Sequence, residues 1–140
     1  MQQALASPSE PVGKRMRAAY FLRQAYENNQ NQSVVVETLG QGLLEKEHGS
    51  LMRHEFGYVM GQLRDERCCE VLERVLGDET DCTMVRHETA EALGAIGAKR
   101  SIPVLEETIA RFQNVPELAE TCQIALDYIQ WNSSGKKEEE

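Results

Sequence analysis

Apolar residues recur along this chain at the spacing of a helix that buries one face. The clearest stripe consists of Met52, Phe56, Val59, Met60 and Leu63. It returns 33 residues later as Val85, Thr89, Ala92, Leu93 and Ile96. This spacing predicts amphipathic helices. No strand-like alternation of apolar and polar residues persists for long, so the pattern predicts an all-α chain.

Polar positions repeat with the same period. The segment RHEFGYVMGQLRDER begins at Arg53, and RHETAEALGAIGAKR begins at Arg86. Arginine, histidine, glutamate and glycine recur together, with Gly61 in step with Gly94. A fixed period of this size is typical of stacked supersecondary units.

Further helical segments surround the two stripes. Each stripe is followed by a second helical pattern, over 68–77 with Gly77 as a C-cap, and over 102–112. Weaker repeats are expected over 16–27 and 33–44. A last helix should run from an N-cap at Asn114 to about Ile129.

These elements predict one domain and a short tail. We expect HEAT-like helical hairpins forming an α-solenoid of about four helix pairs over residues 1–131. Residues 132–140 are polar and should be a disordered tail or the start of a linker.

Charge and composition narrow the function classes. The chain of 140 residues carries a net charge of −8, which disfavours nucleic acid and anionic membranes as partners. No apolar run reaches the ~18 residues of a membrane span. The N-terminal segment also lacks the apolar core of a signal peptide. We therefore expect a cytoplasmic protein whose four cysteines are free thiols.

The two His-Glu pairs, His54-Glu55 and His87-Glu88, lie off the core-facing stripe. A helix turns about 100° per residue, so each histidine falls roughly opposite the stripe and each glutamate falls on its flank. The glycine seven residues after each histidine is expected to leave space beside it. In a solenoid this side of the helix is exposed and often binds ligands.

Histidine and carboxylate side chains suit Fe(II), Mn or Zn. Neighbouring His and Glu side chains diverge on a helix, so one pair does not easily hold one ion. The axes of successive helices lie about 8–10 Å apart, and long side chains can converge across that gap. Two pairs would therefore share a two-metal centre more easily. Zincin chemistry is not predicted, because Tyr58 and Glu91 stand where the second histidine of H-E-x-x-H would be. A duplicated, solvated surface motif would give the same pattern.

Three other polar residues receive simpler interpretations. Arg53 and Arg86 are expected to pair with acidic neighbours rather than bind an anion. His48, within Glu-Lys-Glu-His-Gly, is expected to be a loop residue.

The chain resembles the deoxyhypusine hydroxylase family from about residue 10 to Trp131. The resemblance rests on LMRHEFGYVMGQLRD, MVRHETAEALGAIG and LAETCQIALDYIQW, and on an opening helix around RAAYFLR. It implies a HEAT-repeat dyad of two similar halves, each with two His-Glu motifs. Together the motifs would surround a non-haem centre of two iron ions that activates dioxygen. Carried over by position, the iron-site residues are His54, Glu55, His87 and Glu88.

The resemblance also implies a substrate and a missing part. The family hydroxylates the deoxyhypusine side chain of eukaryotic translation initiation factor five A, which forms hypusine. Family chains are longer, and their third and fourth His-Glu motifs have no counterpart here. The chain therefore resembles the N-terminal half, and its C-terminal half or a second copy of the chain would complete the site. Whether the chain is a fragment or a natural short form stays open, as does its activity alone.

Two other hypotheses remain beside the monooxygenase. One is a non-catalytic HEAT-repeat scaffold that binds a protein partner. The other is a HEAT-like lyase or chaperone for a tetrapyrrole. The paired His-Glu motifs favour the monooxygenase.

Overall fold

The computed structural model describes residues 7–134. Within that range the chain forms seven α-helices and no strand. The helices are α2 (Val12–Glu27), α3 (Gln32–Leu44), α4 (Ser50–Leu63), α5 (Cys69–Leu76), α6 (Thr83–Ile96), α7 (Ile102–Arg111) and α8 (Pro116–Ser133). Short 3-10 turns, Lys46–His48, Glu66–Cys68 and Lys99–Ser101, precede α4, α5 and α7.

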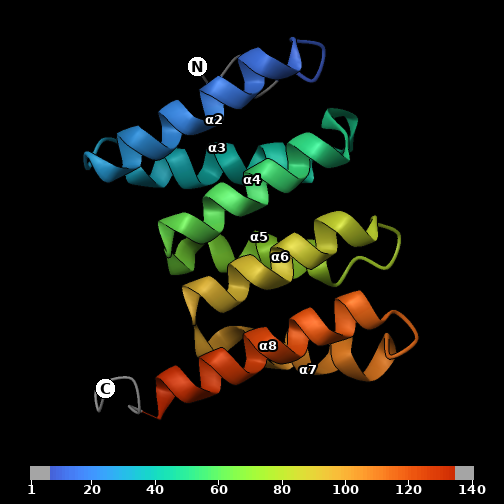
Figure 1. The fold of residues 1–140 in the computed structure, drawn as a ribbon. Coiled ribbons are helices and arrows are strands. Elements are labelled where there is room, and N and C mark those ends of the chain that lie inside the picture. The colour runs from blue at the N-terminus through green and yellow to red at the C-terminus, as the bar shows by residue number, and fades with distance from the viewer. Residues whose placement is uncertain (1–6, 135–140) are drawn as a thin grey trace.

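The helices stack as antiparallel pairs in two layers (Figure 1). Helices α2, α4, α6 and α8 form one layer, and α3, α5 and α7 form the layer behind it. Within the first layer, α4 packs along α6 and α6 packs along α8. The predicted all-α solenoid is confirmed, with one difference in the count. The described residues contain three helix pairs and a single α8 rather than four pairs.

The predicted helices agree with the structure except near the C-terminal end. Asn114 does not cap the last helix, because α8 begins at Pro116 with Val115 at the cap position and no side-chain cap bond. Proline at the first turn supplies the start instead. Helix α8 also continues through Ser133, so residues 132 and 133, which we assigned to the tail, are helical. The predicted disorder of 135–140 lies outside the described residues.

Both apolar stripes form the core. Met52, Phe56, Val59 and Met60 are at most 1% exposed. Their counterparts on α6 are buried as well, apart from the half-buried Ile96. Thr89 fits this stripe because its hydroxyl donates to the Arg86 carbonyl oxygen at 2.7 Å, which satisfies its polar group within the helix. The four cysteines are free, as expected.

Two glycines set the spacing of the first layer. A Cβ added at Gly61 would lie 3.0 Å from the Ala92 Cα, and one at Gly94 would lie 3.0 Å from the Ala125 Cα. The glycines therefore let α4 approach α6, and α6 approach α8, with backbone against backbone. Our expectation that they leave open space beside the histidines is wrong, because the neighbouring helix fills that space.

Buried arginines tie each repeat to the next. Arg53 donates to the Leu43 carbonyl oxygen at 2.6 Å and to both oxygens of Asp81, at 2.7 and 2.6 Å. Arg86 makes the equivalent bond to the Leu76 carbonyl at 2.9 Å, but its guanidinium lies over the Phe112 ring. The predicted acidic partner is confirmed for Arg53 and wrong for Arg86.

His48 is part of a similar junction rather than an open loop. It lies in the 3-10 turn before α4 and is only 6% exposed. Its Nδ1 is 3.0 Å from Nη1 of Arg15, and its ring meets the Phe56 ring edge-on. The loop interpretation is therefore wrong, because the turn packs against the core.

We expect Asp81→Asn to lower the free energy of unfolding by about 3–5 kcal/mol. Both side chains of the Arg53–Asp81 pair are 4% exposed, so the change leaves a buried guanidinium without its counter-charge. The Arg53 hydrogen bonds hold the pKa of Asp81 below its usual range. The stabilisation from the pair is therefore complete above the usual pKa range of aspartate and is lost as pH falls through the depressed pKa.

Urea unfolding at several pH values measures the free energy of unfolding of Asp81→Asn, with the exposed Asp127→Asn as the control. An equal loss of unfolding free energy in both variants at neutral pH would contradict the stabilising role of the Arg53–Asp81 pair.

We expect Gly94→Ala to destabilise the fold by about 1–3 kcal/mol, because the added methyl group forces α6 and α8 apart. Gly13→Ala is the matched control, since Gly13 is exposed in the first turn of α2 and an added Cβ would meet only the flexible end of Arg17, at 4.0 Å. Alanine there should leave stability unchanged or raise it slightly, through its better helix propensity. Thermal unfolding followed by circular dichroism compares the two. An unchanged melting temperature in Gly94→Ala would show that the close packing of α6 against α8 is unimportant for stability.

Candidate metal centre

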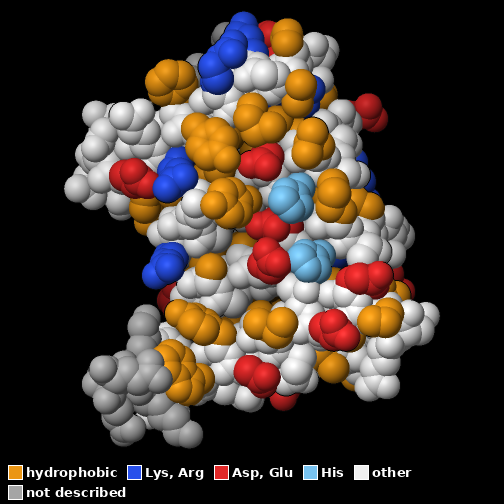
Figure 2. Space-filling view, viewed as in Figure 1, with side chains coloured by type: hydrophobic (Ala, Val, Ile, Leu, Met, Phe, Trp, Pro, Cys, Tyr) orange, Lys and Arg blue, Asp and Glu red, His pale blue; other side chains and the backbone are white. Residues whose placement is uncertain are grey.

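Three of the four predicted ligands lie on the outer face of the first layer, and Glu88 lies between α4 and α6. His54 and Glu55 come from α4, and His87 and Glu88 come from α6. Figure 2 shows two histidines on this face with carboxylates gathered between and beside them. The histidine side chains are 31% and 35% exposed, so they do lie off the core, as the helical angles predicted.

Glu88 differs from the other three because it is buried. Its side chain is 6% exposed and lies against α4. A Cβ added at Gly57 would come within 3.3 Å of the Glu88 Cγ, so Gly57 provides the room for this carboxylate. The sequence pattern placed Glu88 on the flank of its helix but did not indicate that α4 would cover it.

The shortest contact joins the two His-Glu pairs rather than the members of one pair. Nε2 of His54 is 3.0 Å from Oε2 of Glu88, across the α4–α6 boundary. Within its own pair, Nδ1 of His54 is 3.9 Å from the nearest Glu55 oxygen. The stacking of repeats therefore brings His54 closer to Glu88 of the next pair than to its own neighbour Glu55.

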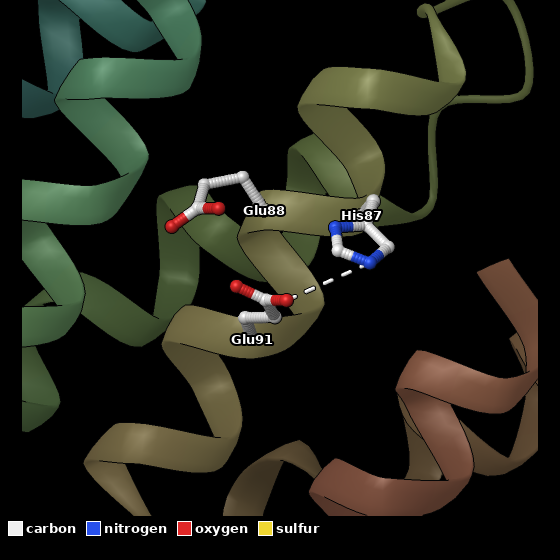
Figure 3. A group of neighbouring side chains, drawn as sticks. All are labelled: His87, Glu88 and Glu91. Carbon is white, nitrogen blue, oxygen red and sulfur yellow. Dashed lines mark ion pairs between the residues drawn. The ribbon is translucent and has the colours of Figure 1, made fainter. Parts of the chain in front are cut away.

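A third carboxylate joins the group. His87, Glu88 and Glu91 each offer a ligand atom, and these atoms lie within 4.8 Å of one another. Figure 3 shows Glu91 one turn below His87, with its carboxylate toward the ring, and Nε2 of His87 is 3.5 Å from Oε1 of Glu91. Sequence reasoning used Glu91 only to exclude a zincin motif. Its position four residues after His87, on the same side of the helix, was the signal that could have identified it.

Electrostatics at this site favour a bound cation. Burial, together with the negative charges of Glu91 and Glu55, raises the pKa of Glu88 to about 8. Carboxylates crowded in this way disfavour their own ionised forms, and a divalent cation between them would reverse that preference. Imidazole and carboxylate ligands suit Fe(II), Mn or Zn. The residues present therefore fit a metal of this class.

Two hollows open beside the carboxylates. One, of about 180 Å³, is lined in part by Tyr58, Glu88 and Glu91. The other, of about 420 Å³, lies between α6 and α8 and includes Ile124 and Tyr128. Because Glu91 borders both, the acidic group lies between largely apolar hollows. Arg64 also lines both hollows, and the two carboxylates outnumber it, so the surface would suit a ligand with an alkyl chain and a positive charge.

The comparison with known families matches the observed fold. Residues 36–126 match the family described as HEAT repeats. The chain belongs to the HEAT-repeat family. None of the helices within residues 7–134 has the length and apolar character that a bilayer span requires.

Individual proteins that resemble the chain carry a more specific name than the repeat family. The chain is 38% identical over 133 residues to deoxyhypusine hydroxylase of Drosophila melanogaster, covering 95% of this chain and 41% of that protein. It is 35% identical to the Mus musculus deoxyhypusine hydroxylase, covering 92% of this chain and 40% of that one. The structure of human deoxyhypusine hydroxylase in complex with glycerol superposes with a TM-score of 0.84 at 32% identity. That match covers 96% of this chain and 44% of the human chain.

These comparisons confirm the resemblance seen in the motifs. They also show that the chain spans about 41% of the length of the curated relatives it matches. The assignment of His54, Glu55, His87 and Glu88 to a metal site stays a prediction.

We expect His54→Ala and His87→Ala each to weaken Fe(II) binding by more than about tenfold, since removing a ligand should cost at least as much as removing its outer-shell partner. Unfolding free energies should change by no more than about 0.5 kcal/mol, because both side chains are partly exposed and outside the core. Glu120→Gln is the control, being an exposed glutamate on α8 in the repeat that lacks a histidine. Anaerobic equilibrium dialysis measures the affinities. Iron retained at the level of the unmutated chain in both histidine variants would refute the site.

Proposed function

We propose that this chain provides one half of a deoxyhypusine hydroxylase, a monooxygenase that hydroxylates the deoxyhypusine side chain of eukaryotic translation initiation factor five A to form hypusine in the cytoplasm. The observation that carries the proposal is the 3.0 Å contact of His54 with Glu88 between two repeats. It supports one shared centre rather than two separate surface motifs. The relatives and the solved structure that the chain matches bear the same enzyme name.

The proposal assigns roles to the residues of this chain. His54, Glu55, His87 and Glu88 would hold iron, and Glu91 adds a fifth candidate group. When bound, two iron ions supply the activation of dioxygen and the oxidation of a C–H bond. A carboxylate that is not needed by the metal is suited to bind the ammonium group of the substrate.

The surrounding surface supports a long cationic side chain as the substrate. The apolar hollow beside Ile124 and Tyr128 can cover the methylene groups of such a chain. Glu91 at its border can meet the charge. The net charge of −8 favours the approach of a positively charged substrate segment over long range.

A complete centre requires more groups than this chain supplies. Two His-Glu pairs and Glu91 provide five ligand groups, which is few for two ions that must also keep positions open. We propose that the C-terminal half of a longer protein, or a second copy of this chain, supplies the remainder. A two-fold arrangement of copies would bring four His-Glu pairs together.

A non-catalytic scaffold is the second candidate. Large apolar side chains are exposed on the face that carries the histidines, including Ile124 at 70% and Tyr58 at 43%. Exposed apolar surface of this kind is also typical of protein-binding sites. Iron content measured after anaerobic loading separates the two candidates, because a scaffold needs no metal.

We expect dilute monomer to show little hydroxylase activity, and activity to rise steeply with protein concentration or when the other half is added. The physical reason is that assembly would complete the set of iron ligands. By mass action, the assembled fraction rises with protein concentration. Analytical ultracentrifugation beside a hydroxylation assay on the deoxyhypusine-bearing factor measures both quantities. The His54→Ala, His87→Ala double variant is the control, since it should still assemble but remain inactive. Full turnover by a proven monomer would show that two motifs suffice.

A further inference from the structure

Tyr20 reaches the candidate metal centre from α2, in a repeat that carries no His-Glu pair. Its hydroxyl donates a hydrogen bond to Oε2 of Glu55 at 3.1 Å, across 35 positions of sequence. The tyrosine is 40% exposed, so the core does not account for its presence at this position. The contact connects the first repeat directly to one of the predicted ligands.

The two glutamates of the centre are held in different ways. Glu88 is buried against α4 and contacts His54 at 3.0 Å. Glu55 is 22% exposed, and its Oε1 is 3.9 Å from His54, too far for a hydrogen bond. Within residues 7–134, the Tyr20 hydroxyl is the only hydrogen-bond donor to the Glu55 carboxylate. Without it, the described residues leave this carboxylate only the longer contact with His54.

The contacts also follow a common direction along the array. Tyr20 on α2 reaches forward to Glu55 on α4, just as His54 on α4 reaches forward to Glu88 on α6. Each glutamate therefore meets a side chain from the preceding helix of the same layer. In the first repeat this side chain is a tyrosine, which donates a hydrogen bond and leaves Oε1 of Glu55 available to a cation.

The geometry points to Tyr20 as a positioning residue that orients Glu55 for metal binding. This inference rests on the function proposed above. A carboxylate held in one orientation before the ion arrives loses less side-chain entropy when it binds. Hydrogen bonds to metal-binding carboxylates typically contribute 10–100-fold to affinity.

The test measures Fe(II) binding to the full chain by anaerobic equilibrium dialysis. Tyr20→Phe, which removes only the hydroxyl, should weaken binding by about 10–100-fold. Tyr26→Phe is the matched control, because Tyr26 lies on the same helix and its hydroxyl also donates to a carboxylate, that of Asp65 at 2.7 Å, which is not one of the predicted ligands. That variant should stay within about twofold of the unmutated chain.

A double-mutant cycle separates positioning from a general structural role. Glu55→Asp withdraws the carboxylate from the hydroxyl, so Tyr20→Phe should have no further effect on affinity in that background. The inference is overturned if Tyr20→Phe has the same effect in both backgrounds. It is also overturned if the variant lowers the melting temperature while affinity is unchanged. Tight binding by the unmutated chain with no loss in Tyr20→Phe would overturn this inference alone. A folded, unmutated chain that binds no Fe(II) even at concentrations at which it assembles would overturn the proposed function with it.

Discussion

The close approach of α4 to α6 is the constraint on which the candidate metal centre depends. Gly61 brings the α4 backbone against Ala92, and Gly57 gives the Glu88 side chain its place between the helices. At this separation an imidazole on one repeat can contact a carboxylate on the next, as His54 and Glu88 do at 3.0 Å. Larger side chains at the two glycines would separate the helices and with them the two His-Glu pairs. The chemistry of the surface therefore depends on packing below it.

The site places polar and charged groups where apolar ones would be more stable. Glu88 is buried beside other carboxylates, and its raised pKa of about 8 reflects that cost. Phe56, Leu72, Leu93 and other fully buried side chains provide the hydrophobic stabilisation that offsets it. Strain of this kind at one location, within an otherwise regular array, is typical of a functional site.

Much of the fold could be predicted from periodicity. The buried stripe of Met52 and Phe56 fixed the orientation of α4, and the 33-residue repeat carried the same orientation to α6. The pairing of helices into a solenoid followed from that repetition. The start of α8 was mispredicted because Asn114 is a good cap residue by type, whereas Pro116 began the helix. The difference is one residue, which is the usual uncertainty of a helix boundary.

The site was predicted less completely, for a different reason. Helical angles place side chains around one helix, and they correctly turned His54 and His87 outward. They contain no information about the neighbouring helix, so the burial of Glu88 and the role of Gly61 in packing were not foreseen. Contacts between repeats also decided the outcome for the buried arginines. Arg86 has the same local sequence as Arg53, but Asn114 stands 33 residues after Asp81 and carries no charge.

The arginine junctions have a consequence for how such arrays can be lengthened or shuffled. Each of Arg53 and Arg86 bonds a carbonyl ten residues earlier, which any tandem copy of the unit would preserve. The carboxylate that pairs with Arg53 belongs to Asp81. It lies 28 residues later, in the connection that leads into the next unit. A transplanted module therefore brings its arginine but takes the counter-charge from whatever sequence follows it. Compatibility between modules is determined at these connections, so a recombined array should be designed with the acidic connection and the preceding arginine exchanged together.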